Sequence, residues 1–365
     1  MSFEQGPIRP PSEANSLLIR VARNCPWNKC RFCPVYKDAR FSRRPVEDVL
    51  ADIDAVAAWI EVFERGGAAP AGAAPTDPAA RAAAMSWHAA GMQSVFLQDA
   101  NPLANPAADI IAVLRRLREY FPGIRRITTY ARSRTVARLS AEELAAMGEA
   151  GLNRVHIGFE SGSDQILEFM DKGVTKAIQA EAGRKIKAAG MELSAYYMPG
   201  LGGRELWREN ALETADLMNQ VDPDFIRMRT LAIPDRLALA TDVAEGRFAK
   251  ANDVEVAEEI LLFIRSLGGI GSMVVSDHIL NLIQDLEGRL PGDRDSMIAR
   301  LETFLSLDPE EQALYRLGRR AGVFLGLADL TDPRRRALAE RMFRELRVDA
   351  GNIDSVCDQL VKRFI

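Results

Sequence analysis

Six short apolar runs alternate with stretches of helical periodicity along the first two thirds of the chain. Between the runs, apolar residues recur every three or four positions, as they do on one face of an α-helix. Strands that alternate with helices are typical of a parallel sheet with right-handed crossovers, either closed as a barrel or left open and doubly wound. The pattern therefore predicts an α/β fold. The apolar runs are 17–24, 94–100, 126–132, 154–161, 192–200 and 225–233.

The strand pattern fades after position 235, and the rest of the chain shows helical periodicity. We therefore predict a flexible N-terminal arm over 1–16, an α/β region over 17–235 and a helical C-terminal region over 236–365. An Ala-, Gly- and Pro-rich insert, 66–84, interrupts the α/β region. The helices expected in the C-terminal region are 254–265, 277–289, 294–306, 309–320, 334–346 and 353–364.

The charge balance of the chain bears on its partners. Lys and Arg number 47 against 51 Asp and Glu, which gives a formal net charge of −4. This balance lacks the basic excess of a typical nucleic-acid-binding protein, so a nucleic-acid partner is disfavoured. The sequence also shows no signal-peptide pattern and no apolar run of about 18 residues. We therefore expect a cytoplasmic protein with no membrane span.

Three of the four cysteines lie close together in the segment CPWNKCRFCP, directly after the first apolar run. Cys25, Cys30 and Cys33 have the spacing C-x4-C-x2-C, and clustered cysteines in a chain without an export signal are typically metal ligands. Pro26 and Pro34 disfavour regular structure here, which lets each thiolate turn towards a shared metal centre. Three thiolates on a [4Fe–4S] cluster leave one iron open for catalysis.

Two other interpretations of the cysteine segment remain open. A structural zinc site would need a fourth ligand. The residues available for it, all distant in sequence, are Cys357, His88, His156 and His278. An electron-transfer cluster with four cysteines would require Cys357, which we expect to be a buried apolar residue of the last helix. Either alternative would make this chain a metal-stabilised binding protein, whereas an iron with an open coordination position would indicate an enzyme.

The cysteine segment resembles the signature of the radical S-adenosylmethionine (SAM) superfamily. That signature has the spacing C-x3-C-x2-C with an aromatic residue before the last cysteine, a position that Phe32 occupies here. The extra residue between Cys25 and Cys30 is a departure from it. The segments FLQDANPL, YAR, IGFESGSD and MPGLGG are similar to those of anaerobic coproporphyrinogen-oxidase-like members, so the resemblance covers roughly residues 15–235.

This resemblance implies a partial (β/α)6 TIM-like barrel and two cofactors, a [4Fe–4S] cluster and SAM. It implies that the reduced cluster cleaves SAM to a 5′-deoxyadenosyl radical, which abstracts hydrogen from a substrate. It also implies an electron donor such as flavodoxin or ferredoxin. The substrate, a small molecule, lipid or peptide, does not follow from the family. The sequence has no Asp-x-His-x-x-Gly motif for cobalamin and no second cysteine set for an auxiliary cluster.

The resemblance further implies SAM contacts at the ends of the predicted strands. Gln98 and Asp99 lie where the family has a Gly-Gly-Glu-like segment and would accept hydrogen bonds from the SAM amino group. The alternative for them is a turn that enters a helix, where Asp is common. Glu160 and Ser161 match the ribose-binding position, and their alternative is a solvated strand end.

Basic residues offer a partner for the SAM carboxylate. Lys172 and Arg184 are the two candidates, and each is equally explained as a solvated charge on a helix. The other residues that we predict to lie at the barrel mouth or the adenine pocket are Tyr130, Arg132, Met198, Gly200 and Met228.

Overall fold

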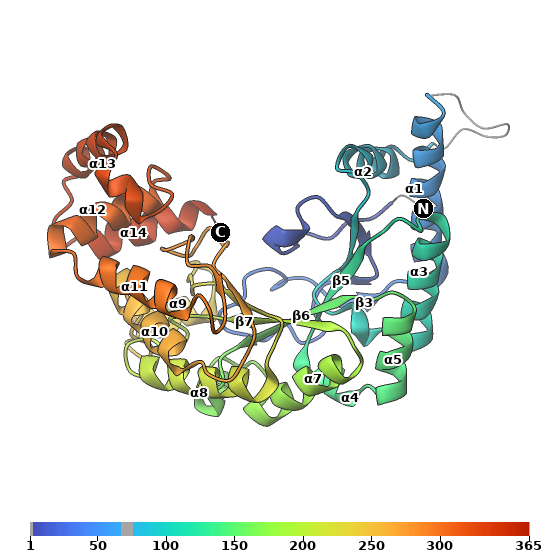
Figure 1. Cartoon of the computed structure of the whole chain (residues 1–365), viewed down its shortest axis with the longest axis horizontal. Coiled ribbons are helices and arrows are strands. Elements are labelled where there is room, and N and C mark those ends of the chain that lie inside the picture. Colours follow the sequence, from blue (N-terminus) through green and yellow to red (C-terminus); the bar gives the residue numbers. More distant parts are fainter. Residues whose placement is uncertain (1–2, 67–75, 365) are drawn as a thin grey trace. The chain divides into compact units, whose positions relative to one another are not determined.

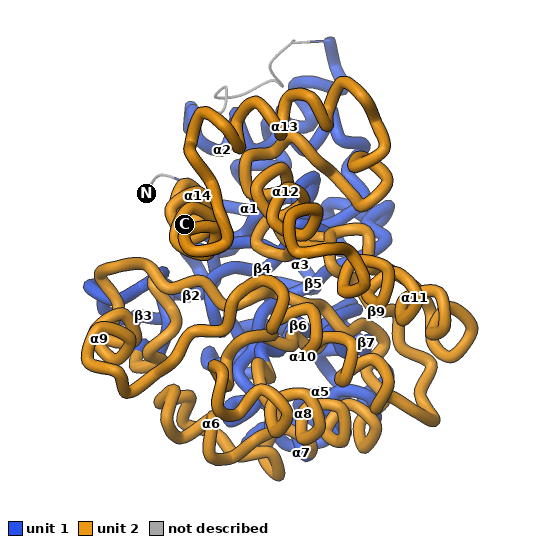
Figure 2. Tube along the Cα trace, turned by 90° about the vertical axis from the view of Figure 1, so that its left-hand side faces the viewer, with its two compact units in different colours: residues 1–28, 35–158, 181–194 blue, residues 29–34, 159–180, 195–365 orange. Residues whose placement is uncertain are grey.

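The protein is described by a computed structural model that covers residues 3–66 and 76–364. The chain divides into two compact units, which Figure 2 colours blue and orange. Each unit is assembled from segments that are distant in the sequence. Unit 1 comprises residues 1–28, 35–158 and 181–194, and unit 2 comprises residues 29–34, 159–180 and 195–365.

Eight strands form one mostly parallel sheet. In the order in which they pair, they are β1 (Leu17–Arg20), β4 (Ser94–Gln98), β5 (Arg126–Ala131), β6 (Arg154–Glu160), β7 (Glu192–Tyr197), β8 (Phe225–Met228), β9 (Met273–Val275) and β10 (Gly288–Arg289). The first six correspond to the six predicted apolar runs. The predicted α/β class and the strand order of the partial barrel are therefore confirmed. Figure 1 labels β5, β6 and β7 of this sheet.

Within unit 1, the strands pair in parallel register. Phe96 of β4 lies opposite Leu18 of β1 on one side and Thr128 of β5 on the other. Every residue of β4 is buried, as expected for a parallel strand that is covered on both faces. The helices of this unit are α1 (Val46–Glu64), α2 (Pro78–Ala89), α3 (Ala107–Tyr120), α4 (Ser133–Arg138), α5 (Ala141–Glu149) and most of α7 (Lys176–Ala188).

Side-chain caps define where two of these helices begin. Ser140 Oγ accepts from the Glu143 amide at 3.1 Å, and the Glu143 carboxylate accepts from the Ser140 amide at 2.8 Å, which forms a capping box at α5. At α2 the Asp77 carboxylate caps the helix by accepting from the amides of Ala79 and Ala80. The predicted insert over 66–84 is therefore too long, because its alanine-rich end is helical from Pro78 onwards. Positions 67–75 of that insert lie outside the described residues.

The N-terminal segment packs on unit 1, which corrects the prediction of a flexible arm. Phe3 and Glu13 are buried. Glu4 forms ion pairs with three arginines of the unit. Apolar burial and charge pairing thus hold a stretch whose proline-rich, polar composition is typical of a loose segment.

Unit 2 is mostly helical after β8. Its helices are α6 (Asp164–Phe169), α8 (Trp207–Val221), α9 (Ala238–Ala244), α10 (Asp253–Ser266), α11 (Arg294–Leu305), α12 (Pro309–Arg320), α13 (Pro333–Glu345) and α14 (Ile353–Val361). Among the described residues, no helix is both long and apolar enough to cross a membrane.

The predicted helix over 277–289 is wrong, because residues 277–287 form turns and irregular backbone between β9 and β10, and residues 288–289 form β10. Ser276 Oγ donates to the Ile283 carbonyl at 2.7 Å. The Nδ1 atom of His278 accepts from the Leu280 amide at 3.2 Å. Hydrogen bonds of this kind compete with those of a helix, so the apolar spacing of the segment does not produce one.

Candidate active site

The cysteine loop, defined here as residues 24–41, is closed at its base by a short antiparallel strand pair. The two strands are β2 (Ala22–Arg23) and β3 (Ser42–Arg43). Between them the backbone is irregular, as the prolines predict. Cys25 belongs to unit 1, whereas Cys30 and Cys33 belong to unit 2. All three are outside disulfide bonds and have intermediate exposure.

Asp99 anchors the start of the cysteine loop within unit 1. Its carboxylate is fully buried, and Oδ2 accepts from the Asn24 amide at 3.2 Å. The same oxygen accepts from Nε and Nη2 of Arg20, at 2.9 and 2.6 Å. The Tyr36 hydroxyl donates to Oδ1, and burial together with this carboxylate raises the pKa of Tyr36. Asp99 therefore links β1 to both ends of the loop segment that carries the cysteines.

Gln98 anchors the N-terminal segment in the same unit. Its Oε1 accepts from the Gly6 amide at 2.8 Å, and its Nε2 donates to the carbonyls of Gly6 and Ile8 at 3.1 and 2.7 Å. Gln98 and Asp99 are the two residues predicted to contact the SAM amino group. In the structure, these hydrogen bonds join them to other groups of the protein. Their buried positions are explained by loop and segment anchoring.

Cys30 and Cys33 pack, within unit 2, against an apolar cluster around Phe32. The guanidinium of Arg31, between them in sequence, pairs with the buried Asp242 at 2.6 Å. Partial burial of the thiols matters because solvent exposure is one of the factors that set the potential of an iron–sulfur cluster. The buried members of this Phe32 cluster are Phe32, Ile166, Met170, Met198, Leu201, Leu231, Leu239 and Phe248.

Two predicted SAM contacts meet at the end of β6. Lys172 Nζ lies 3.1 Å from Glu160 Oε1 and 5.5 Å from the centroid of the Phe32 ring. The neighbouring Ser161 Oγ accepts from the Ser163 amide at 3.1 Å, as a residue that shapes a turn does. The structure therefore brings Glu160, Lys172 and Phe32 together inside unit 2.

Three other residues predicted to contact SAM lie in unit 1 and have different neighbours. In unit 1, the Arg132 guanidinium lies 5.0 Å from the ring centroid of Trp27 and so contacts the cysteine loop. The Tyr130 ring packs edge-on against Phe96, with centroids 5.1 Å apart. Arg184 lies on the exposed side of α7, which matches the alternative of a solvated helix charge.

The two predicted methionines of unit 2 are both buried. Met198 follows β7 directly and belongs to the Phe32 cluster. Met228 ends β8, and its carbonyl accepts from Asn281 Nδ2 at 2.8 Å. Met198 is thus placed beside Phe32, whereas Met228 is tied to the turn segment before β10.

The loop after β7 rests on a carboxylate that sequence reasoning missed. Glu259 of α10 accepts from the Gly200 amide at 3.0 Å and from the Tyr197 hydroxyl at 2.5 Å. It also accepts from the side-chain amide of Asn210 at 2.7 Å. Burial raises the pKa of Glu259 to about 7. The signal in the sequence was an acidic residue on the apolar stripe of a predicted helix.

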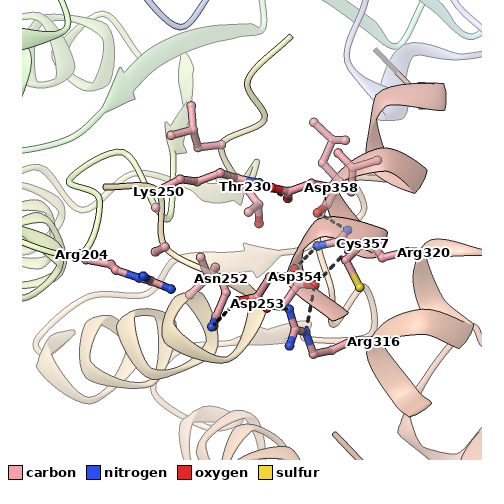
Figure 3. Close-up of a pocket in the computed structure, with 16 residues that line it drawn as sticks. Arg204, Thr230, Lys250, Asn252, Asp253, Arg316, Arg320, Asp354, Cys357 and Asp358 are labelled. Carbon is pink, nitrogen blue, oxygen red and sulfur yellow. Dashed lines mark hydrogen bonds and ion pairs between the residues drawn. The ribbon is translucent and has the colours of Figure 1, made fainter. Parts of the chain in front are cut away.

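A cavity of about 140 Å³ lies within unit 2 beside the same loop (Figure 3). Asp253 pairs there with Arg316 and Arg320, and Lys250 pairs with Asp358. Burial opposes ionisation of Asp253, yet the two guanidinium groups hold its pKa well below the usual range. This ion-pair network ties the start of α10 to α12 and α14.

A family model described as the radical SAM superfamily matches residues 19–215. The match covers more than half of the chain and includes the cysteine loop, the Phe32 side chain and the loop after β7. The chain belongs to the radical SAM superfamily. Members of this superfamily use a [4Fe–4S] cluster and SAM.

Solved structures of radical SAM proteins are similar to this chain at low sequence identity. Coproporphyrinogen III oxidase (HemN) from Escherichia coli is 14% identical with a TM-score of 0.48, over 69% of this chain and 52% of HemN. Elp3 from Methanocaldococcus infernus is 14% identical with a TM-score of 0.44, over 72% of this chain and 56% of Elp3. The radical SAM methyltransferase TsrM from Kitasatospora setae is 15% identical with a TM-score of 0.45, over 63% of this chain and 38% of TsrM.

The chain spans about half the length of HemN and Elp3 and less of TsrM. No curated protein matches it.

The donor set of this radical SAM protein fits an iron–sulfur cluster, since three cysteines that form no disulfide share one irregular loop. Cys357 is buried, and burial raises the pKa of its thiol to about 12, as befits an apolar residue of α14. Within the described ranges, no three His, Cys, Asp or Glu side chains gather closely enough to hold one metal ion. That finding concerns a single ion, whereas each thiolate of a [4Fe–4S] cluster binds a different iron.

Proposed function

We propose that this chain is a radical SAM enzyme in which Cys25, Cys30 and Cys33 bind a [4Fe–4S] cluster. The observation that carries the proposal is the set of three cysteines, none of them in a disulfide, on one irregular loop inside the family match. When bound, the cluster supplies the electron that splits SAM into methionine and a 5′-deoxyadenosyl radical, which takes a hydrogen atom from the substrate. Three protein ligands leave one iron for SAM.

The chain itself holds the cysteine loop in place. Asp99 fixes the amide that precedes Cys25, and the Arg31–Asp242 pair braces the backbone between the other two cysteines. Ligands that are held by surrounding contacts bind their metal centre without first having to be ordered. In this proposal Gln98 and Asp99 are positioning residues and do not contact SAM.

The remaining contacts to SAM are proposed from unit 2. Glu160 at the end of β6 accepts from the vicinal ribose hydroxyls, and Lys172 beside it supplies a positive charge for a carboxylate. The loop that starts with Met198 and Gly200 contacts the adenine. These roles follow the family resemblance, and the contacts of Lys172 with Glu160 and with the Phe32 ring support them.

The partners are proposed at the level of chemical class. The substrate is a small molecule, lipid or peptide with a C–H bond that the radical attacks. A one-electron donor such as flavodoxin or ferredoxin supplies the reducing equivalent. Both follow from the radical chemistry of the superfamily.

Anaerobic reconstitution with iron and sulfide tests the proposed function. We expect about four iron atoms per chain, and 5′-deoxyadenosine once the protein is reduced with dithionite in the presence of SAM. Cys30→Ala should lose both the iron and the product, whereas the matched control Cys357→Ala should keep both. Stoichiometric zinc after metal-free anaerobic purification would support the zinc alternative instead.

A further inference from the structure

Glu259 is a fully buried carboxylate whose hydrogen-bond donors are neutral. The three donors are the Tyr197 hydroxyl, the Gly200 amide and the side-chain amide of Asn210. Placing a carboxylate in an apolar interior is costly unless its oxygens are hydrogen-bonded. The groups that satisfy it all belong to β7, to α8 or to the loop between them.

These bonds fix both ends of the loop after β7. Tyr197 is the last residue of β7, and Asn210 lies early in α8 and also donates to the Met198 carbonyl at 3.2 Å. Between them, Gly200 has a φ of +85°, and a Cβ there would lie 3.4 Å from Val256 of α10. The helix that carries Glu259 therefore packs directly against the loop.

The position of α10 is itself fixed from its N-terminal end. Asn252 and Glu255 form a capping box there. The adjacent Asp253 pairs with Arg316 and Arg320 of α12 (Figure 3). A helix outside the family match, 19–215, thus presents Glu259 to a loop inside that match.

We propose that Glu259 is a positioning residue that holds the loop after β7 in the conformation that binds the adenine end of SAM. The inference rests on the proposed function, in which this loop contacts SAM. By fixing the Gly200 amide, the carboxylate orders the surrounding backbone before SAM arrives, and less conformational entropy is lost on binding. Its removal weakens SAM binding and leaves the cysteine ligands in place.

The test compares Glu259→Gln with Glu258→Gln, because Glu258 is the exposed neighbour on the same helix turn. An amide oxygen and an amide nitrogen cannot accept all three bonds, so one donor loses its partner. We expect Glu259→Gln to bind SAM about tenfold more weakly in equilibrium dialysis of the reconstituted protein. The KM for SAM should rise by a similar factor, with kcat and iron content unchanged, and Glu258→Gln should match the wild type.

Hydrogen exchange of the Gly200 amide gives a readout that does not depend on catalysis. Exchange should be faster in Glu259→Gln than in the wild type. Tyr197→Phe keeps the ring that stacks on Phe263, with centroids 4.2 Å apart, and removes one donor, so its loss of SAM affinity should be smaller, about threefold. This variant tests the inference even where Glu259→Gln folds poorly.

The two possible failures are separate. Wild-type SAM affinity together with wild-type exchange at Gly200 in Glu259→Gln would overturn the role of Glu259. A wild-type chain that binds no cluster and yields no 5′-deoxyadenosine overturns the proposed function, whatever the exchange at Gly200 shows.

Discussion

Two fully buried glutamates, Glu13 in unit 1 and Glu259 in unit 2, have opposite electrostatic surroundings. Glu13 Oε2 accepts from the Ser16 hydroxyl at 2.6 Å and from Arg126 at 3.1 Å, and His156 lies 3.8 Å from its other oxygen. Burial raises the pKa of both carboxyl groups. For Glu13 the surrounding polar and charged groups outweigh burial and bring the pKa down to about 2. For Glu259, with neutral donors, the pKa rises to about 7.

The difference shows that the polar and charged groups around an interior carboxylate can outweigh burial in setting its charge. Glu13 stays ionised across the neutral range, whereas Glu259 changes protonation within it. Asp99, which anchors the cysteine loop, resembles Glu13 because its main partner is the Arg20 guanidinium. The anchor of the cysteine loop is thus built on an ion pair, and the anchor of the loop after β7 is built on hydrogen bonds from neutral groups.

Removing the cation beside Glu13 should have the largest effect. Arg126→Met leaves a buried carboxylate without its guanidinium. Because the Arg126 side chain is one third exposed and Ser16 still donates to Glu13, we expect the free energy of unfolding to fall by about 3 kcal/mol, the low end for a broken buried pair. Urea denaturation at pH 7 measures this loss. The exposed neighbour Arg125 supplies the control, since Arg125→Met should change stability by less than about 0.5 kcal/mol. If both variants lost an equally small amount of unfolding free energy, Arg126 would not stabilise the charge of Glu13, and the proposed difference between Glu13 and Glu259 would fail.

The contributions of Glu259 and Glu13 to stability should change in opposite directions as the pH rises. The pKa of Glu259 in the folded chain, about 7, lies above its ordinary value of 4.5, so folding takes up a proton there. Its contribution is fully present below pH 4.5 and is lost as the pH rises through 7. Relative to Glu259→Gln, the wild type should lose roughly 3 kcal/mol between pH 4.5 and 8. Parallel stability curves for the two proteins would contradict this expectation.

Glu13 should behave in the opposite way. Its pKa in the folded chain, about 2, lies below the ordinary value of 4.5. The stability it contributes is therefore present above pH 4.5 and is lost as the pH falls towards 2. Comparing wild type with Glu13→Gln by denaturation between pH 5 and 3 should show the wild type losing its advantage. If the wild type instead became more stable relative to Glu13→Gln as the pH falls, the lowered pKa of Glu13 would be wrong.

Neutralising the anchor of the cysteine loop should have a smaller effect on stability but a visible effect on the cluster. Asp99→Asn loses the ionic partner of Arg20 and keeps part of the hydrogen bonding, so we expect a loss of about 2 kcal/mol. Iron retained after reconstitution should fall, because the amide before Cys25 is less firmly held. Asp38→Asn, at an exposed position of the same loop, should retain full iron.

The smallest effect is expected from Tyr197→Phe. The variant removes one hydrogen bond to Glu259 and should cost about 1 kcal/mol in the free energy of unfolding. It also removes a donor that favours the ionised carboxylate, so the pH at which stability falls should move upwards. A stability curve that keeps its wild-type midpoint would show that the hydroxyl does not support the charge.

Local patterns in the sequence were enough to predict most of the sheet and several helices. The six strands followed from apolar runs, and the start of α5 followed from the Ser140 and Glu143 spacing of a capping box. The turns over 277–287 escaped prediction because their apolar spacing resembles that of a helix. Hydrogen bonds from side chains to the backbone, such as the one from Ser276 to the Ile283 carbonyl, favour the turns, and apolar spacing does not reveal them.

The candidate site was predictable only where its residues are close in sequence. The spacing of Cys25, Cys30 and Cys33 identified the loop, and Phe32 lies beside them. Glu259 escaped because its partners lie about 50 to 60 positions earlier, and such contacts depend on the fold. The anchoring role of Asp99 escaped for the same reason, since Arg20 and Asp99 meet only after β1 pairs with β4.

The β2–β3 pair at the base of the cysteine loop has a consequence for how such a loop changes length in evolution. Because the two strands close the loop on themselves, an added residue is absorbed between them and does not shift the register of β1 or the start of α1. Lengthening a closed loop of this size by one residue costs only about 0.05 kcal/mol of closure entropy. In closure entropy alone, the extra residue of the C-x4-C spacing is therefore nearly neutral for the stability of the fold.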